Sequence, residues 1–474
     1  MSQFDLIATA TFGLENVVAR ELKQLGYEDC QVTDGRVLFR GDLRDIARCN
    51  LWLRSADRVL IRVGEFPAAD FGALFDQTTE LPWADLLPVD AKFPVKGRSV
   101  RSRLHAVPKV QGVTKKAIVE ALKKKHNRFR FDESGALYQV EVSLVKDVAT
   151  LTIDTTGPGL HKRGYRRIVG AAPLRETMAA GLIQLSYWND SRPLIDPFCG
   201  SGTIPIEAAL IGRNIAPGLQ RSFAAEDFRW FERNTWREAR TEARDLKSRE
   251  ACGPILASDH DPGAIRLAQR GATDAGVGAN IRFECKEVSE LTSALEYGCI
   301  ITNPPYGERL GDNEQVEAVY RVMGKVFDNL PTWSFYVLTS YRWFEKHFGR
   351  RADRRRKLYN GRLECQYYQY AGPRPPRPED DEISDRPAEQ SSTDDNQQPS
   401  DLQPSNTATA APATTPDAHQ LNTSHVVTTD IHLPTDTDVA SAGIDPFQTF
   451  IADCSTGAGK TASKDSEATD SHGG

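Results

Sequence analysis

Short apolar strands alternate with helices from about Pro173 to Tyr370, and this alternation constrains the fold more than any other feature. Such a pattern is typical of a doubly wound parallel α/β sheet with helices on both faces. Ligands bind these sheets at the carboxyl ends of the strands, so chemically important residues should directly follow strands. We expect strands at 194–195, 254–258, 281–284, 299–302 and 334–339, and helices at 204–211, 262–275 and 315–330.

The preceding half of the chain predicts two small α+β units. Apolar runs and helical spacing in residues 1–65 indicate the order strand, helix, strand, helix, strand. Residues 66–156 repeat this style, with helices expected at 71–77 and 111–125 and strands at 92–95 and, as a pair, within 138–153. The predicted domains are therefore 1–65, 66–156, a Rossmann-like domain at 157–372 and a tail at 373–474.

Charge is distributed unevenly along the chain. Residues 372–474 contain 18 acidic and 5 basic side chains, a net charge of -13, whereas residues 1–371 carry a net charge of +7. The acidic segment is rich in Pro, Ser, Thr and Gln and has few large apolar residues, so burial cannot offset its ordering entropy. We predict that 373–474 is disordered, and the basic body permits a polyanionic partner.

Several classes of protein are disfavoured by composition. The eight cysteines are scattered without a Cys-x-x-Cys pair, which predicts reduced thiols and no zinc site. The N-terminal sequence lacks the pattern of a signal peptide, and no stretch approaches 18 apolar residues. We expect a cytoplasmic protein with no metal, no membrane contact and no obligate protein partner.

A glycine-rich turn, Asp-Pro-Phe-Cys-Gly-Ser-Gly-Thr, follows the first strand of the alternating region and opens a helix. Glycines allow a tight turn and close approach of a ligand. A dinucleotide fingerprint would need a third glycine at position 205, where Pro205 stands. The acidic residue favours a cationic ligand such as S-adenosylmethionine, although a tight turn without a ligand is the alternative. The expected cofactor contacts here are Asp196, Phe198, Gly200, Ser201, Gly202 and Thr203.

Two further acidic positions follow the next strands. Asp259 directly follows the strand at 254–258, where a carboxylate can accept both ribose hydroxyls of a nucleoside. Asp261 precedes Pro262 and is expected to cap the following helix. Glu287 follows the strand at 281–284 and is expected at the adenine amino group, with a solvated loop glutamate as the alternative.

The sequence Asn303-Pro304-Pro305-Tyr306 directly follows the apolar strand at 299–302. Its prolines stiffen the loop and remove two backbone donors. The Asn303 side-chain oxygen and the Pro304 carbonyl can together accept both protons of an aromatic amine, which aims the nitrogen lone pair at a methyl donor. Tyr306 can stack on the base. We therefore predict catalytic roles for Asn303, Pro304 and Tyr306, with Asn303 also touching the cofactor, and methylation of an exocyclic amine.

Clusters of basic residues in the N-terminal half predict contacts to RNA phosphates. Phe93 and Phe129 lie among them and are candidates for stacking on unpaired bases. A solvated helix face is the alternative for any one cluster. A further basic run at 350–357 is a candidate RNA-binding segment near the active site. The predicted RNA-binding residues are Lys96, Arg98, Arg101, Arg103, Lys123, Lys124, Lys125, Arg128, Lys162 and Arg163.

These motifs resemble those of the THUMP-containing class I methyltransferases. The turn at 196–209, Asn-Ile-Ala-Pro-Gly-Leu at 214–219, Asn-Pro-Pro-Tyr-Gly-Glu-Arg at 303–309, and the stretches 160–166 and 172–177 are similar to the bacterial RlmL/YpsC type, which methylates the guanine 2-amino group of 23S ribosomal RNA. The resemblance covers about 1–370. It implies a ferredoxin-like domain, a THUMP RNA-binding domain, a Rossmann-like catalytic domain and S-adenosylmethionine as methyl donor.

Other functions are compatible with parts of the pattern. A transfer RNA guanine methyltransferase and a DNA adenine methyltransferase would use the same Asn-Pro-Pro-Tyr chemistry, but the DNA enzyme predicts a target-recognition domain in place of the basic α+β half. A non-catalytic ribosome assembly factor predicts decay of the glycine-rich turn, which is intact. A nicotinamide-dependent dehydrogenase fails on glycine spacing and leaves Asn303 without a role.

Overall fold

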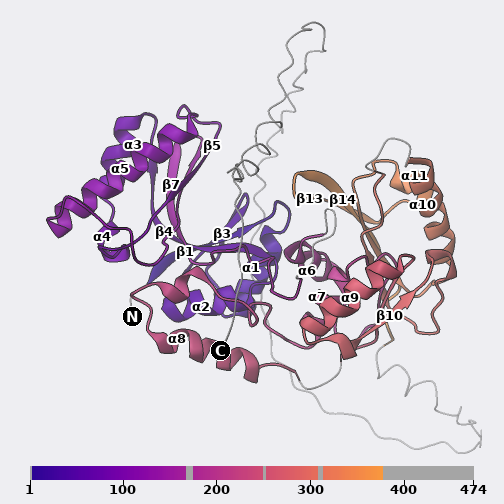
Figure 1. The fold of residues 1–474 in the computed structure, drawn as a ribbon. Coiled ribbons are helices and arrows are strands. Elements are labelled where there is room, and N and C mark those ends of the chain that lie inside the picture. Colours follow the sequence, from indigo (N-terminus) through magenta and orange to yellow (C-terminus); the bar gives the residue numbers. More distant parts are fainter. Residues whose placement is uncertain (1–2, 167–173, 249–251, 308–312, 377–474) are drawn as a thin grey trace, which may run out of the picture. The chain divides into compact units, whose positions relative to one another are not determined.

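The computed structural model describes residues 3–166, 174–248, 252–307 and 313–376 (Figure 1). These residues form two seven-stranded sheets. The predicted disordered tail lies almost entirely outside the described residues, as do Ala172, Pro173, Glu308 and Arg309 of the family motifs.

The first sheet has the order β2-β3-β1-β4-β7-β6-β5. Its central strand β4 pairs with β1 on one side and with β7 on the other, so the two predicted α+β units share a sheet and the expected boundary at residue 65 falls inside β4. The strands are β1 (Phe4–Ala10), β2 (Gln31–Thr33), β3 (Arg36–Gly41), β4 (Ala56–Pro67), β5 (Val95–Val100), β6 (Val140–Val145) and β7 (Val148–Asp154).

The helices of this half bury apolar stripes against the sheet and against each other. In α5 the buried residues Val110, Ala117, Ile118 and Leu122 follow helical spacing, and the helix ends at Asn127 in the left-handed conformation. The helices are α1 (Glu15–Gln24), α2 (Leu43–Trp52), α3 (Phe71–Thr79), α4 (Trp83–Leu86) and α5 (Val107–His126). The strand predicted at 92–95 was misplaced: Lys92 makes an isolated bridge to Leu137, and the paired strand β5 begins at Val95.

The second sheet has the order β10-β9-β8-β11-β12-β14-β13. Strands β10, β9, β8, β11 and β12 are parallel, which confirms the predicted α/β class, but β14 is antiparallel to both its neighbours. The hairpin β13–β14 was not predicted. The strands are β8 (Leu194–Asp196), β9 (Ile255–Asp259), β10 (Ile281–Cys285), β11 (Cys299–Thr302), β12 (Ser334–Thr339), β13 (Arg354–Asn360) and β14 (Leu363–Tyr370).

Helices cover both faces of the second sheet through two separate apolar clusters. One face packs against α6 (Glu176–Gln184), α7 (Thr203–Gly212) and α9 (Pro262–Asp274), and the other against α10 (Asn313–Asp328) and α11 (Phe344–Phe348). Strand order reverses between β8 and β11, so the chain leaves β8 for β9 on one side and returns to β11 on the other. Such a switch point opens a crevice at the carboxyl ends of the strands.

One segment of the predicted Rossmann-like region packs with the N-terminal half. Helix α8 (Arg233–Asp245) lies against α2, as Figure 1 shows, and Trp236 joins the first sheet's apolar core together with Phe223 and Phe228. Arg48 of α2 reinforces the contact by pairing with Glu242 at 3.0 Å. Residues 216–245 therefore connect the Rossmann-like region to the apolar core of the first sheet.

Candidate active site

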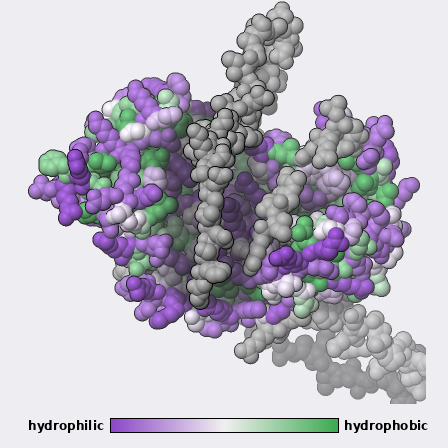
Figure 2. Space-filling model, in the orientation of Figure 1, coloured by the Kyte–Doolittle hydropathy of each residue, from purple (hydrophilic) through white to green (hydrophobic). Residues whose placement is uncertain are grey.

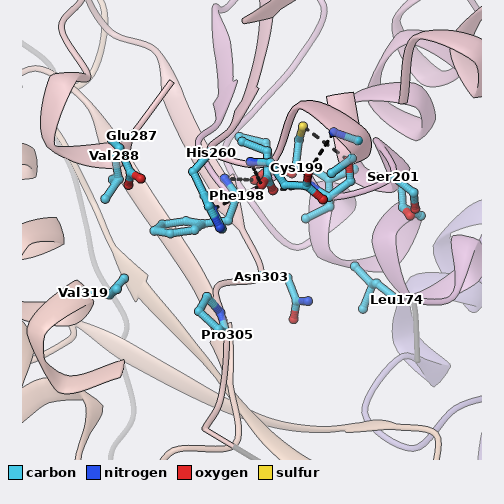
Figure 3. Close-up of a pocket in the computed structure, with 18 of the residues that line it drawn as sticks. Leu174, Phe198, Cys199, Ser201, His260, Glu287, Val288, Asn303, Pro305 and Val319 are labelled. Atoms are coloured by element: carbon cyan, nitrogen blue, oxygen red, sulfur yellow. Dashed lines mark hydrogen bonds and ion pairs between the residues drawn. The ribbon is translucent and has the colours of Figure 1, made fainter. Parts of the chain in front are cut away.

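A cavity of about 850 Å³ lies at the carboxyl ends of β8, β9, β10 and β11. In Figure 3, Glu287, Val288 and Val319 gather at one side of it, Ser201 and Leu174 lie at the other, and Asn303 and Pro305 face Phe198 and Cys199 across the opening. The walls thus include the loops that follow four of the five parallel strands. This is where the alternating pattern predicts a ligand.

The glycine-rich turn forms one wall of this cavity. Gly200 and Gly202 have φ values of 52° and 80°, which side chains rarely tolerate. A Cβ on Gly202 would also lie 2.9 Å from the Cβ of Ala268 in α9, whereas a Cβ on Gly200 would meet nothing within 4 Å. Gly202 therefore lets α7 pack tightly and does not line the cavity, unlike the other predicted contacts of this turn, Asp196, Phe198, Gly200, Ser201 and Thr203.

Asp196 places a buried carboxylate at the base of the cavity. It is 1% exposed and accepts hydrogen bonds from Thr302 Oγ1 at 2.7 Å and from the Phe198 amide at 3.2 Å. Burial raises the pKa of Asp196 to about 7, and the nearby charge of Asp259 adds to the shift. A buried acid with this environment gains from a cation, because a neighbouring positive charge favours the ionised form.

Asp259 connects two of the loops. Its Oδ2 accepts from the Gly200 amide at 2.9 Å, and its Oδ1 accepts from the Asp261 amide at 3.0 Å. His260 Nδ1 also lies 3.4 Å from Oδ1, whereas Oδ2 retains a further acceptor site, so a ribose-binding role stays a prediction. Asp261 caps α9 by accepting from the Gly263 amide at 2.7 Å, as predicted.

The far side of the cavity is mostly apolar. Val288, Val316 and Val319 line it beside the exposed Glu287, whose backbone begins a short 3-10 helix over Val288–Glu290. An apolar slot with one acidic group at its edge suits an adenine ring bearing an amino group. Sequence reasoning missed the valines of α10, although their spacing of three residues at the start of a predicted helix was a usable signal.

The Asn-Pro-Pro-Tyr loop forms the wall opposite the glycine-rich turn. Asn303 and Pro305 line the cavity, whereas Pro304 is buried and Tyr306 packs against the apolar cluster of α6, α7 and α9. The Tyr306 hydroxyl donates a hydrogen bond to Oδ1 of Asn303, and burial raises the pKa of Tyr306. In this structure Tyr306 thus orients the Asn303 side chain from the side that faces the apolar cluster. Its stacking on a base stays a prediction.

Comparison with known proteins gives this geometry a family. The chain matches the RMKL-like methyltransferase domain over residues 163–369, the RlmL ferredoxin-like domain over 5–60 and the THUMP domain over 68–154. It is 49% identical over 372 residues to the "Putative RNA methyltransferase YpsC" of Bacillus subtilis (strain 168), covering 78% of this chain and 96% of that relative. The chain belongs to the RlmL-like methyltransferase family.

Solved structures agree with this assignment. A protein of Listeria monocytogenes str. 4b F2365, described as a predicted N6-adenine-specific DNA methylase, shares 51% identity with a TM-score of 0.75, covering 79% of this chain and 97% of that one. SMU.472, described as "a putative methyltransferase complexed with SAH", shares 45% identity with a TM-score of 0.75, covering 79% of this chain and all of that one. Both structures thus share the fold of this chain.

The predicted RNA-binding residues of this RlmL-like methyltransferase are either exposed or at least partly buried. Most are exposed on the THUMP part, where Figure 2 shows a largely hydrophilic face. Lys123 is half-buried and pairs with Glu120 at 2.9 Å, while Arg98 and Arg103 lie 3.6 and 3.5 Å from acidic partners. The exposed members are Lys96, Arg98, Arg101, Arg103, Lys124, Lys125, Arg128 and Lys162.

Two of the predicted RNA contacts are wrong because their side chains are buried. Arg163 is 3% exposed and pairs with Glu207 of α7 at 3.3 Å. Phe93 is 1% exposed and belongs to the apolar core. Phe129, by contrast, is 87% exposed and is free to stack on a base. Within the described residues no helix is long and apolar enough to cross a membrane, and no group of three metal-ligating side chains occurs.

Proposed function

We propose that this chain transfers a methyl group from S-adenosylmethionine to the exocyclic 2-amino group of a guanine in 23S ribosomal RNA. The observation that carries the proposal is the position of Asn303, which lines the cavity across from the glycine-rich turn. The glycine-rich turn would hold the methyl donor, and Asn303 on the opposite wall would accept a hydrogen bond from the target amine. This arrangement would bring the two reacting groups together.

The residues present fit the donor. Its ammonium and sulfonium groups suit the buried carboxylate of Asp196, and its adenine suits the slot of Val288, Val316 and Val319 beside Glu287. The relative complexed with S-adenosylhomocysteine has 45% identity to this chain. When bound, S-adenosylmethionine supplies an electrophilic methyl group.

Asn303 supplies the acceptor for the target amine. The nitrogen of an aryl amine is a poor nucleophile while its lone pair is delocalised into the ring. A hydrogen bond from the amine to Oδ1 of Asn303 turns the lone pair toward the methyl group, and positioning of this kind can supply several kcal/mol, up to about 7 or more in well-oriented systems. With the donor bound, the new N–C bond would form as the methyl C–S bond breaks with its electron pair going to sulfur, and the nitrogen would then lose its proton to water.

Two features support RNA as the substrate. The THUMP match spans residues 68–154, and the exposed basic residues of that region offer phosphate contacts. The B. subtilis relative is named as an RNA methyltransferase, whereas the L. monocytogenes structure is described as a predicted DNA adenine methylase. Guanine follows from the family resemblance, because an Asn-Pro-Pro-Tyr loop accepts adenine and guanine amines alike.

The test compares the wild-type chain with Asn303→Ala, using Asn329→Ala as a control at an exposed position of the methyltransferase domain. Undermethylated 23S ribosomal RNA, transfer RNA and duplex DNA are each incubated with labelled donor, and methylated nucleosides are identified by mass spectrometry. We expect N2-methylguanosine in ribosomal RNA. Its rate of formation should be at least about 100-fold lower with Asn303→Ala and unchanged with Asn329→Ala. Methylation of transfer RNA or DNA alone, or full turnover by Asn303→Ala, would contradict the proposal.

A further inference from the structure

Edge strand β13 carries four consecutive cations, Arg354, Arg355, Arg356 and Lys357, whose side chains alternate between two faces. Those of one face have acidic partners within the chain. Arg355 Nε donates to Glu345 Oε1 at 2.9 Å, and Lys357 pairs with Glu364 at 2.7 Å. The first face is therefore neutralised by the protein itself.

The second face carries Arg354 and Arg356 and lies beside Arg20 of α1. Within the described part of the chain none of these three arginines forms an ion pair with an acid. Arg20 donates to the Gln184 carbonyl at 2.6 Å, and the Nε of Arg356 is buried without a hydrogen-bond partner among the described residues. Arg20 therefore reaches the carboxyl end of α6, and Gln369, which lies opposite Arg354 in the hairpin, contacts the same end of α6 through the Leu185 carbonyl at 3.1 Å.

Repulsion by neighbouring cations disfavours the charged form of Arg356. Burial lowers the pKa of Arg356, and the charges of Arg354 and Arg20 lower it further. Like charges in contact destabilise a fold unless a counter-charge offsets them. Guanidinium groups with free donors match phosphate oxygens in geometry as well as in charge.

We propose that Arg20, Arg354 and Arg356 form a phosphate-binding cluster that holds the backbone of the RNA substrate beside the active site. The proposal rests on the proposed function for the identity of the RNA.

The course of β13 connects the cluster with the catalytic loop. Strand β13 runs antiparallel to β14, which runs antiparallel to β12, so β13 and β12 end at the same edge of the sheet. Asn360, the last residue of β13, contacts the Tyr306 hydroxyl. Arg356 lies four residues earlier, about 13 Å along the strand. RNA bound at the cluster would therefore lie within a few nucleotides of Asn303.

An exposed aromatic ring follows the end of α6 that contacts the hairpin. Gln369 pairs with Arg354 across the hairpin, and its side chain donates to the Leu185 carbonyl at 3.1 Å. Two residues further on, Tyr187 is 65% exposed. Surfaces that bind single-stranded nucleic acid combine basic side chains with exposed aromatic rings, and an exposed tyrosine in the segment that follows α6 favours RNA over the acidic C-terminal segment as the occupant.

The test uses the full chain and two double variants that remove the same charge from the same strand. Arg354→Gln/Arg356→Gln removes the unpaired face, and Arg355→Gln/Lys357→Gln removes the paired face. The dissociation constant for 23S ribosomal RNA fragments is measured over a series of salt concentrations. Each lost phosphate contact reduces the steepness of the fall of log K, the association constant for RNA, with log salt by about 0.7–0.9. We expect a decrease of about 1.5 for the first variant and less than about 0.5 for the second.

Each result bears on the proposal in one direction. Equal slopes for the two double variants would overturn it, and so would tighter RNA binding by the first, because that result would place the acidic C-terminal segment on the cluster. Arg20→Gln, at an exposed helix position, gives an independent test if the double variant fails to fold, with a decrease of about 0.8 expected. Donor binding and methylated products are measured separately. A reduced salt dependence of RNA binding in the first double variant, together with no N2-methylguanosine from the wild-type chain, would contradict the proposed function and support the cluster.

Discussion

The hydroxyl of Thr302 donates a 2.7 Å hydrogen bond to Oδ1 of Asp196 in the floor of the cavity. Thr302 ends β11 and precedes Asn303, whereas Asp196 ends β8 and begins the glycine-rich turn. A single hydrogen bond therefore joins the wall assigned to the target amine to the wall assigned to the methyl donor. It also favours the ionised form of a carboxylate whose burial disfavours it.

Donor binding should depend on pH through Asp196. The pKa of Asp196 is about 7 in the folded chain, so the carboxyl is largely neutral at pH 6 and ionised at pH 8. Affinity for cationic S-adenosylmethionine should rise as pH increases through 7. Asp196→Asn should abolish this dependence and weaken binding at pH 8 by about 10- to 100-fold, because hydrogen bonds to charged groups contribute about 1.5–3 kcal/mol. Calorimetric titration at pH 6 to 8 measures both effects.

The stability of the unliganded chain should change in the opposite direction. Because the folded-state pKa of Asp196 lies above its ordinary value of 3.8, its contribution to stability is fully present below about pH 4 and is lost as pH rises through 7. Asp328→Asn, at an exposed site, serves as the control for both measurements. Donor affinity that is flat from pH 6 to 8 in the wild-type chain would refute the assigned role.

Thr302→Val should shift the pH profile without altering the shape of the cavity. The substitution removes the hydroxyl that lowers the pKa of Asp196, so the midpoint of donor binding should move above pH 7. Thr302→Ser retains a donor and should keep the wild-type midpoint. The same calorimetric series checks this prediction, and an unchanged midpoint in Thr302→Val would show that the hydrogen bond does not control the carboxylate.

Tyr306→Phe should slow methyl transfer while leaving donor binding intact. Its hydroxyl donates to Oδ1 of Asn303 and fixes the orientation of the amide. Loss of one hydrogen bond of about 0.5–1.5 kcal/mol predicts a fall in kcat of about 2- to 10-fold. Tyr306→Ala separates this role from base stacking: if stacking dominates, Phe retains full activity and only Ala loses it. Single-turnover rates with saturating RNA provide the measurement.

Local patterns were enough to predict the strands and loops that build the cavity. Residues 299–302 and 334–339 are apolar runs bounded by turn residues, and the observed strands β11 and β12 have those bounds. Buried parallel strands give continuous apolar runs, which are recognisable in one sequence. The glycine-rich turn and Asn303 follow such strands, so their convergence at one edge could be inferred from topology.

The failures have a different physical cause. The hairpin β13–β14 was not predicted, because the run Arg354 to Lys357 has no apolar pattern and its partner β14 supplies the apolar face. Arg163 looks like an RNA contact among Lys162 and its neighbours, but its partner Glu207 lies 44 residues away along the chain. Burial of a charged residue depends on such distant partners, and local sequence patterns contain no information about them.

The buried pair of Arg163 and Glu207 should be essential for stability. Arg163 Nε and Nη2 both donate to Glu207 at 3.3 Å, and the Tyr165 hydroxyl donates to the same carboxylate at 3.2 Å. Glu207 lies in α7, directly behind the glycine-rich turn. Arg163→Met leaves the carboxylate buried without its counter-charge, which typically costs about 3–5 kcal/mol. Chemical denaturation of the full chain should show a loss of that size.

A matched substitution and a compensating one make this prediction specific. Arg282 also pairs with a glutamate, Glu284 at 2.7 Å, but its side chain is 79% exposed. Arg282→Met should therefore change the free energy of unfolding by no more than about 1 kcal/mol. Adding Glu207→Leu to Arg163→Met removes the orphaned charge and should recover much of the loss. Equal destabilisation by Arg163→Met and Arg282→Met would contradict the buried-pair explanation.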